Sequence, residues 1–442
     1  MFFQEEFETM PREQLRELQL LRMRDTFKRC YDNVDFYKKA FNGAGVVPED
    51  LKSLDDLRKF PFTVKQDMRD AYPYKLFAVP MDKVARIHAS SGTTGQATVV
   101  GHTAGDLARW GECFARGIRM ADLGPGTVMQ VAYGYGLFTG GLGAHVGGEV
   151  AGCCVIPASS GNTKRQIQMI KDMGVELLAC TPSYALLIAD SAIEMGYDPA
   201  VDFKLKAGIF GAEPSSDGMR REIAQKLGIR YCDVYGLSEI MGPGVAMECG
   251  HGEGLHFAED HFYPEIIDPD TLEPLPDGEW GELVITTLTR ECTPLVRYRT
   301  RDISRIIAQP CSCGRTHRRI DRIIGRTDDM LIIRGVNVFP SQIEQVIAEV
   351  PGIATQYQIT VGTRGSLDYV ELAVEMAPDF VFDEIRQLEG LKKKLAAELK
   401  SNLQIAVDIR IVEPHTIERS EGKAKRVIDL RKNTGTIRGI GK

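Results

Sequence analysis

The chain has 442 residues, which is too long for one small core and predicts two or three domains. Its 43% hydrophobic and 26% charged content is ordinary for a soluble globular protein, and the net charge of −7 gives no basic field to hold nucleic acid. No apolar run approaches the roughly 18 residues of a membrane helix, and the acidic N-terminus lacks a secretory pattern, so we expect a cytoplasmic protein with no membrane partner.

Apolar runs of two kinds follow each other along the chain. Residues 11–34 have apolar side chains at helical spacing and predict an amphipathic helix. Between residues 84 and 325, runs such as VMQVAYG and AGIFGAE are bounded by Gly and Pro and alternate with helical stretches. This pattern predicts an α/β fold with buried parallel strands and crossover helices. Residues 265–288 have the pattern of strands with tight turns, and we expect a small β-barrel or an antiparallel sheet there.

A domain boundary is predicted within residues 325–350. Two apolar strands flank a Gly turn, and Pro340 precedes a helix in which Ser341 and Glu344 can form a capping box. Four apolar side chains of that helix share one face: Ile343, Val346, Ile347 and Val350. We therefore expect a large N-terminal domain, residues 1–327, and a small α+β domain, residues 328–442.

The stretch HASSGTTGQATVV, residues 88–100, is a polar loop between two expected strands. Its hydroxyls and glycines are Ser90, Ser91, Gly92, Thr93, Thr94 and Gly95. Glycines let a backbone approach an anion closely, and successive N–H groups can form a phosphate nest. The spacing is not that of a P-loop, and a solvated turn favours the same residue types, so composition alone leaves both interpretations open.

Four later stretches put this loop in context. They are YGLSE at 235–239, YRTRD at 298–302, GRTDD at 325–329 and SEGKAKR at 420–426. Together the five stretches resemble the ordered motifs of adenylate-forming enzymes, which activate a carboxylate with ATP. Further stretches, such as YGYGLFTGGLGAH and LIIRGVNVFPSQIE, resemble the phenylacetate–CoA ligases and related aryl-CoA ligases over nearly the whole chain. One departure is Gln96, which stands where the family's loop often has lysine.

The resemblance implies a nucleotide site and a mobile C-terminal domain. It implies that Tyr235 stacks on adenine, that Asp302 accepts hydrogen bonds from the ribose, and that Glu239 binds Mg²⁺. The nucleotide-binding residues implied besides the loop are Gly211, Ala212, Glu213, Pro214, Asp233, Gly236, Ser238 and Arg326. Asp328 is the implied hinge of the small domain. For Asp302 the rival interpretation is a salt bridge with an arginine of YRTRD, and for Glu239 a helix-capping surface carboxylate.

The resemblance also implies a catalytic lysine near the C-terminus. The family's motif has lysine directly after glycine and arginine three residues further on, and Gly422, Lys423 and Arg426 match that spacing. Lys425 does not match it. An ammonium can bridge the attacking carboxylate and the α-phosphate. We therefore expect Lys423 to serve adenylation, and a solvated basic loop is the rival interpretation.

The acid substrate is expected, by the same resemblance, beside aromatic and small residues of one stretch. These are Tyr133, Tyr135, Phe138 and Gly140. Apolar walls with small residues suit a flat aromatic ring. Ordinary core packing is the alternative for each of these residues.

Three of the ten cysteines lie among histidines and glycines. Cys311 and Cys313 are one residue apart, and Cys249 with a histidine could complete a closed tetrahedral zinc site. We choose His256 over His251 as the fourth ligand because it enters an expected strand. The C-x-C spacing departs from the usual C-x₂₋₄-C, and reduced thiols in a turn are the alternative.

The expected activity is that of an ATP-dependent ligase. It converts an aryl acid, phenylacetate or a close analogue, to its coenzyme A thioester through an acyl-adenylate, with release of AMP and pyrophosphate. The implied small molecules are ATP, Mg²⁺ and coenzyme A, with a structural Zn²⁺, and the family expectation is a homodimer. One alternative is an adenylation enzyme that loads an aryl acid onto a carrier protein. Another is a non-catalytic, zinc-stabilised nucleotide-binding module.

Overall fold

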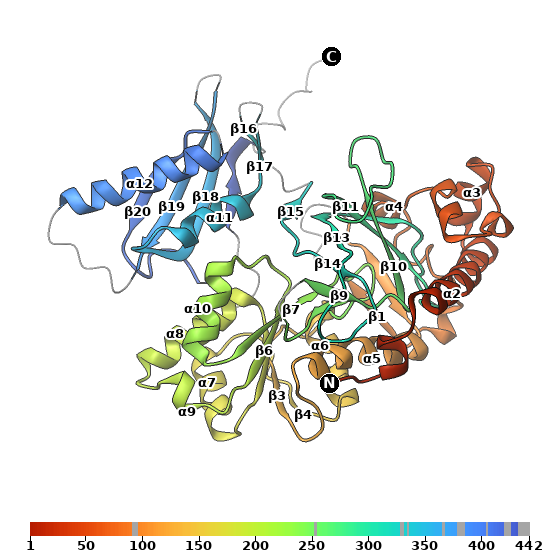
Figure 1. Ribbon diagram of the computed structural model, residues 1–442, viewed down its shortest axis with the longest axis horizontal. Helices are drawn as coiled ribbons and strands as arrows, with labels where there is room; N and C mark the ends of the chain where they lie inside the picture. Colours follow the sequence, from red (N-terminus) through yellow and green to blue (C-terminus); the bar gives the residue numbers. More distant parts are fainter. Residues whose placement is uncertain are drawn as a thin grey trace, which may run out of the picture.

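The computed structural model has a large N-terminal unit and a smaller C-terminal unit that stands over one end of it (Figure 1). It describes residues 1–90, 96–251, 254–327, 331–333, 336–364, 367–377, 385–403, 405–419 and 426–431. Within these residues, no helix has both the length and the apolar character needed to cross a membrane.

The largest sheet has nine strands, in the order β13-β14-β9-β8-β7-β6-β5-β3-β4. Its parallel part consists of β3 (Val128–Val131), β4 (Cys154–Ile156), β5 (Leu177–Cys180), β6 (Ala207–Gly211) and β7 (Arg230–Tyr235). Its antiparallel part consists of β8 (Ala246–Glu248), β9 (Leu255–Phe257), β13 (Ile306–Ile307) and β14 (Arg319–Ile320).

The helices of this region are α5 (Ala104–Met120), α6 (Thr139–Val150), α7 (Thr163–Asp172), α8 (Pro182–Glu194), α9 (Pro199–Asp202) and α10 (Asp217–Leu227). Every residue of β5 and β6 is buried. This burial confirms the prediction that short, wholly apolar runs form parallel strands covered on both faces.

A second, four-stranded antiparallel sheet has the order β10-β11-β12-β15. Its strands are β10 (Phe262–Ile267), β11 (Gly281–Thr287), β12 (Tyr298–Ser304) and β15 (Gly325–Arg326). The expected small β-barrel is therefore wrong, and the alternative of an antiparallel sheet is confirmed. In the part of the chain that the structure describes, β10 and β15 are outer strands that do not pair with each other, because four strands are too few to curve into a closed ring.

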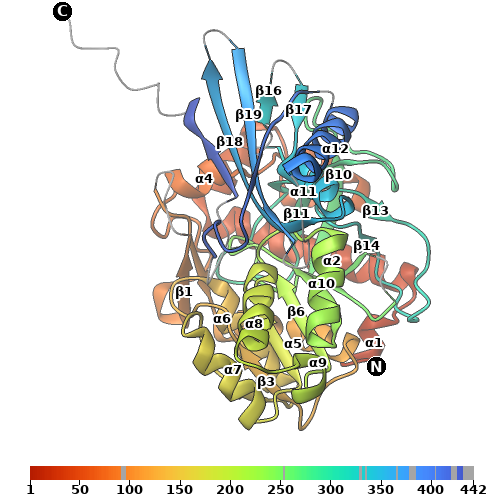
Figure 2. The ribbon, with the colours of Figure 1, turned by 90° about the vertical axis from the view of Figure 1, so that its left-hand side faces the viewer.

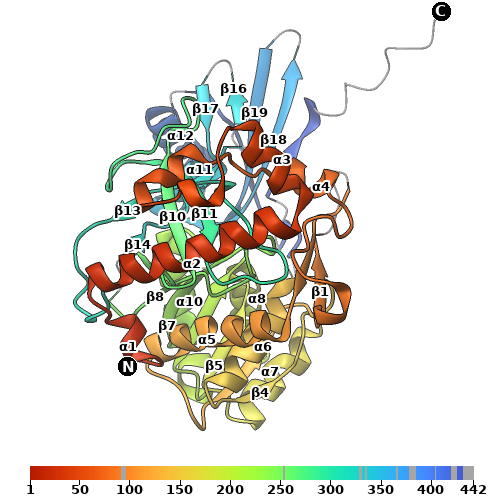
Figure 3. The ribbon, with the colours of Figure 1, turned by 90° about the vertical axis from the view of Figure 1, so that its right-hand side faces the viewer.

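The N-terminal helices cover one side of this unit. They are α1 (Glu5–Glu8), α2 (Arg12–Asn33), α3 (Asp35–Gly43) and α4 (Lys65–Asp70), with 3₁₀ turns at Pro48–Asp50, Leu54–Lys59 and Met81–Lys83. Figure 3 shows α2 running diagonally across that side. It buries Leu15, Met23 and Phe27, so the predicted amphipathic helix is confirmed. The hairpin of β1 (Arg86–Ala89) and β2 (Val99–His102) follows.

The C-terminal unit has its own sheet, in the order β20-β19-β18-β21, and its own apolar core. Its strands are β18 (Ile353–Arg364), β19 (Leu367–Met376), β20 (Asp408–Val412) and β21 (Val427–Asp429). Ahead of them lies the predicted hairpin, β16 (Leu331–Ile333) with β17 (Val336–Val338). Two helices, α11 (Pro340–Glu349) and α12 (Ile385–Leu403), complete the unit. The four apolar side chains expected on one face of α11 are all in the core.

The predicted capping box of α11 is wrong. Pro340 is the first helical residue, so the third helical position is Gln342, whose side-chain oxygen accepts the Phe339 N–H at 2.9 Å. The Ser341 hydroxyl instead donates to the carbonyl oxygen of Ile324. Glu344 is buried at the contact with the N-terminal unit, where its carboxylate has other partners.

Candidate active site and metal cluster

Two neighbouring parallel strands of the main sheet, β6 and β7, end at the same edge of that sheet. Gly211 ends β6 and Tyr235 ends β7, and Gly211 pairs with Val234. Ligands of α/β sheets bind beside the carboxyl ends of parallel strands. The segments after these strands contain the predicted Mg²⁺ ligand Glu239 and five predicted nucleotide-binding residues: Ala212, Glu213, Pro214, Gly236 and Ser238.

Gly236 is required by the protein's own turn. A Cβ at this position would lie 1.8 Å from the carbonyl oxygen of Gly242. The family resemblance implies that this glycine binds the nucleotide. The nearest obstacle to a side chain is instead the backbone six residues further along the chain.

Asp302 on β12 is the centre of a buried polar group. Its Oδ2 accepts a hydrogen bond of 2.6 Å from the Tyr235 hydroxyl, and its Oδ1 lies 3.3 Å from Nη1 of Arg326. Burial and the Asp302 carboxylate raise the pKa of Tyr235. Tyr235 and Arg326, which come from two other motifs, therefore both contact the Asp302 carboxylate.

The rival salt bridge for Asp302 is wrong. The arginines of YRTRD face another carboxylate, because Arg299 Nη2 lies 2.6 Å from Glu282 and Arg301 Nη1 lies 3.5 Å from it. Side chains alternate between the two faces of a strand, so Arg299 and Arg301 share the face opposite to that of Asp302.

Glu239 is buried and paired with a residue that sequence reasoning missed. Its Oε1 lies 3.1 Å from Nζ of Lys65, the first residue of α4. The backbone before Lys65 is anchored on the second sheet, since the Thr63 N–H donates to the Arg297 carbonyl and the Thr63 carbonyl accepts from the Arg299 N–H. Glu239 is 5% exposed, so the rival interpretation of a surface carboxylate does not describe it.

Glu213 and Asp233, two more of the predicted nucleotide-binding residues, have different polar partners. Oε1 of Glu213 accepts the Ser183 N–H at 2.6 Å, at the N-terminus of α8. Asp233 lies 3.5 Å from Nη1 of Arg220, which also pairs with Glu248 at 2.6 Å. Burial raises the pKa of Asp233 to about 6, against the attraction of Arg220.

The hairpin β1–β2 closes the polar loop at its base. The Ser90 N–H donates to the Thr98 carbonyl at 2.9 Å, and the Thr98 N–H donates to Oγ of Ser90 at 2.9 Å. The rest of the loop lies outside the described residues: Ser91, Gly92, Thr93, Thr94 and Gly95. The predicted hinge Asp328 and the predicted catalytic Lys423 also lie outside them.

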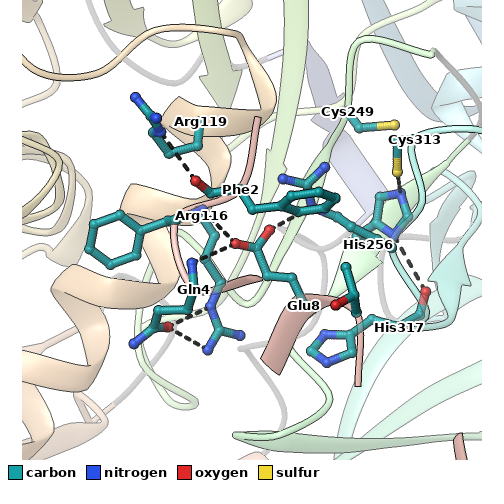
Figure 4. A network of polar contacts seen from close by, with 12 residues as sticks. Phe2, Gln4, Glu8, Arg116, Arg119, Cys249, His256, Cys313 and His317 are labelled. Atoms are coloured by element: carbon teal, nitrogen blue, oxygen red, sulfur yellow. Dashed lines mark hydrogen bonds and ion pairs between the residues drawn. The ribbon is translucent and has the colours of Figure 1, made fainter. Parts of the chain in front are cut away.

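The four predicted zinc ligands lie together. Ligand atoms of Cys249, His256, Cys311 and Cys313 are all within 4.8 Å of one another. Sγ of Cys313 is 3.3 Å from Nε2 of His256 (Figure 4). Sγ of Cys249 is 3.6 Å from Sγ of Cys311. A tetrahedral zinc ion with bonds of about 2.0–2.3 Å separates its ligand atoms by roughly 3.3–3.8 Å. The cluster therefore has the size of a closed zinc site.

The second nitrogen of the histidine supports this arrangement. Nδ1 of His256 donates to the carbonyl of His317 at 3.4 Å, the kind of contact that orients a metal-binding imidazole. His251 is outside the cluster, and its Nδ1 lies 3.1 Å from Oγ of Ser312. The hydrogen bond from Cys249 lowers the pKa of Cys313, which favours the thiolate form.

Comparison with known proteins shows to which family the chain belongs. The model of the AMP-binding enzyme family matches residues 24–289, and that of the AMP-binding enzyme C-terminal domain matches residues 335–431. The chain is 50% identical to the phenylacetate-coenzyme A ligase of Aromatoleum evansii over 430 residues, 97% of each chain. It is 50% identical to the enzyme of the same name from Escherichia coli K12, over 97% of this chain and 98% of the other. The chain belongs to the phenylacetate–CoA ligase family.

A more distant relative has been solved in a postadenylation state, a thioesterification state and an open conformation. The chain superposes on a 2-hydroxyisobutyryl-CoA ligase, in the postadenylation state with 2-HIB-AMP, with a TM-score of 0.91 at 28% identity, over 97% of this chain and 92% of that one. Against the same ligase in the thioesterification state with 2-HIB-AMP and CoA, the TM-score is 0.72 over the same shares. The two units of this phenylacetate–CoA ligase family member are therefore arranged as in the first of these states.

The residues expected at the acid substrate divide into two groups. Tyr133 is buried, its hydroxyl donates to the Ile209 carbonyl at 3.4 Å, and a Cβ on Gly140 would lie 3.6 Å from its ring. Tyr135 is half-buried, and its hydroxyl lies 3.1 Å from Nδ1 of His145. Phe138 is 51% exposed. Tyr133 thus has the contacts of a core residue, whereas Tyr135 and Phe138 have accessible ring surface.

The N-terminal segment packs against the metal cluster, which sequence reasoning also missed. Glu8 is buried and accepts hydrogen bonds from the Phe3 and Gln4 N–H groups at 2.7 and 2.9 Å and from Nε of Arg315 at 2.6 Å (Figure 4). The Thr316 N–H donates to the Glu8 carbonyl at 3.0 Å. The loop that carries two of the cysteines therefore also anchors the start of the chain.

A buried carboxylate on the other side of this loop joins it to α2. Glu259 forms ion pairs with Arg318, at 2.8 Å, and with Arg12. Burial alone would raise the pKa of Glu259, but the two guanidinium groups outweigh burial and lower the pKa to about 2. Glu259 therefore stays ionised at neutral pH.

Proposed function

We propose that this protein is an ATP-dependent ligase that converts phenylacetate or a close aryl analogue to its coenzyme A thioester through an acyl-adenylate. One observation carries the proposal: Tyr235 and Arg326 hold the buried Asp302 carboxylate beside the strand ends, in a chain 50% identical to proteins named phenylacetate-coenzyme A ligase. A carboxylate flanked by these groups can accept two hydrogen bonds from a ribose diol.

The chemistry requires two displacements. A carboxylate oxygen of the acid forms a bond to the α-phosphorus of ATP, and the bond from that phosphorus to the β-bridging oxygen breaks, which releases pyrophosphate. The sulfur of coenzyme A then attacks the acyl carbon, and AMP leaves with the electron pair of the broken carbon–oxygen bond. The first step needs positive charge near the phosphates, and the second needs exact placement of the coenzyme A sulfur.

Named side chains would meet these needs. Glu239 would hold Mg²⁺ together with phosphate oxygens, the arrangement that this ion prefers in nucleotide sites, and the bound ion would neutralise phosphate charge. Lys65, whose Nζ lies 3.1 Å from Oε1 of Glu239, would supply a cation near the outer phosphates in place of the loop lysine that Gln96 replaces. Lys423 would bridge the acid and the α-phosphate during adenylation. Tyr235 would stack on adenine while its hydroxyl holds Asp302.

We propose further that the arrangement of the two units seen here serves adenylation. The support is the higher TM-score, 0.91 against 0.72, to the relative in its postadenylation state. Asp328 would be the pivot for the change to the thioester-forming arrangement, because a hinge residue absorbs the backbone rotation. The acid would lie beside Tyr135 and Phe138, which have accessible aromatic surface.

A structural zinc ion is proposed at Cys249, His256, Cys311 and Cys313. The support is the spacing of the four ligand atoms and the hydrogen bond that Nδ1 of His256 donates to the carbonyl oxygen of His317. Four protein ligands leave no open position, so this ion would stabilise the fold and take no part in the reaction. A homodimer and a cytoplasmic location are further proposals that rest on the family resemblance.

The activity is tested with a panel of acids, ATP, Mg²⁺ and coenzyme A. We expect pyrophosphate release that depends on an arylacetate and a thioester formed on free coenzyme A. If short aliphatic acids greatly outperform arylacetates, the aryl pocket is wrong. If pyrophosphate is released but the thioester forms only on a carrier protein, the carrier-loading alternative is correct, and no turnover with any acid would favour the non-catalytic module.

A further inference from the structure

The two units meet where α11 lies against α10 (Figures 1 and 2). Hydrogen bonds reach α10 and its N-cap from described residues of the C-terminal unit. Oε1 of Glu344 accepts the Ser216 N–H at 3.1 Å, and the Thr355 hydroxyl donates to Oε2 of Glu222 at 2.9 Å. Ser216 is the N-cap of α10, so the Glu344 carboxylate from one unit lies at the N-terminus of a helix of the other, where the helix dipole stabilises negative charge.

Glu344 is also tied into its own unit. It is 4% exposed, and its Oε2 accepts a hydrogen bond of 2.8 Å from the Tyr357 hydroxyl. The guanidinium carbon of Arg426 lies 4.6 Å from the centre of the Tyr357 ring. Burial alone would lower the pKa of Arg426. Attraction to Tyr357, Glu344 and Glu213 outweighs burial and raises this pKa. Glu344 therefore links the N-terminus of α10, through Tyr357, to Arg426.

The close approach of the helices depends on one glycine. A Cβ on Gly218 would lie 2.3 Å from Cβ of Ala348 on α11. Real Cβ atoms do not approach so closely, so any side chain at Gly218 would push the two units apart. Gly218 is a helical residue of α10, and α10 itself would accept alanine readily.

We propose that Glu344 is a positioning residue for adenylation: it docks the C-terminal unit on the N-terminus of α10, and the absence of a side chain at Gly218 permits the docking. The inference rests on the proposed function, in which the docked arrangement serves the first half-reaction. The contact must open when the units rearrange for thioester formation. Weakening it should therefore slow the first half-reaction and leave the second unaffected.

The test measures the two half-reactions separately. Acid-dependent exchange of labelled pyrophosphate into ATP reports adenylation, and thioester formation from supplied phenylacetyl-adenylate and coenzyme A reports the second step. Gly218→Ala should lower the exchange rate about tenfold or more, the effect expected of an overpacked contact on the docked population. Thioester formation should stay within about twofold of wild type. Gly390→Ala is the matched control, because Gly390 is an exposed helical glycine with open space around it, and it should change neither rate.

A second variant removes the charge without adding bulk. Glu344→Gln should lower exchange about fivefold, since a charge-assisted hydrogen bond becomes a neutral one, whereas Glu349→Gln on the exposed side of the same helix should have no effect. Equal loss of both half-reactions in Gly218→Ala and Glu344→Gln, or unchanged exchange in both, would overturn the proposal. Failure of the proposed function is a separate result, because the wild-type protein itself would then show no acid-dependent exchange.

Discussion

Removal of one cysteine from the metal cluster should cost the protein both its zinc and several kcal/mol of stability. The cluster joins Cys249 to Cys311 across 62 positions of the chain. A cross-link that closes a loop of this length restricts the unfolded chain by about 4 kcal/mol at 25 °C. A metal at about a thousand times its dissociation constant also stabilises by about 4 kcal/mol. In a unit of residues 1–327, a loss of about 4 kcal/mol corresponds to a fall in Tm of about 6 °C.

The measurement uses Cys311→Ser and the exposed Cys154→Ser as a matched control. Elemental analysis of protein purified without added metal should find about one zinc per chain in the wild type and in the control, and almost none in Cys311→Ser. Calorimetry should show the lower Tm in Cys311→Ser only. Wild-type protein that contains no metal would refute the zinc site. A Cys311→Ser variant that keeps its zinc and its Tm would refute the ligand set.

Three more predictions concern charged residues. Lys423→Ala should slow adenylation by about 10²-fold or more while thioester formation from supplied acyl-adenylate stays near normal, and Lys425→Ala should alter neither; the reverse pattern would show that the wrong lysine was assigned. Lys65→Met should raise the KM for ATP about tenfold, since it removes the cation that lies 3.1 Å from Glu239, and an unchanged KM would contradict a role at the phosphates. The folded-state pKa of Glu259 is lowered to about 2, so its stabilisation is present above its unfolded pKa and is lost as the pH falls toward 2. Wild type should lose about 3 kcal/mol more than Glu259→Gln between pH 5 and pH 2 in urea titrations, and parallel profiles would rule out this carboxylate as the source.

Motifs near strand ends were predictable because short-range patterns carry them. Tyr235 and Asp302 stand in stretches with recognisable spacing, and a hydrogen bond joins them between β7 of the main sheet and β12 of the antiparallel sheet. The metal ligands could be found for a similar reason, since two thiols one residue apart must lie close together. His256 was separable from His251 by the expected direction of its strand.

Long-range contacts of single side chains were not predictable. Lys65 lies 174 positions from Glu239, and nothing in the residues around it distinguishes it from a surface lysine. Glu344 has the sequence position of a helix cap, yet its burial depends on how α11 meets the other unit. The expected barrel failed because alternating strands with tight turns specify pairing between neighbours, and closure depends on the number of strands.

The apolar core of the C-terminal unit is separate from the cores of the N-terminal unit, and this separation affects how each unit melts. Every side chain of that apolar core belongs to Leu331 or to residues after it, and the cores of the N-terminal unit contain none of these residues. The melting of each unit is therefore governed largely by its own set of apolar contacts. Substitutions within the smaller core should therefore change the melting of the C-terminal unit more than that of the N-terminal unit, so the two halves of this protein can be adapted to temperature one at a time.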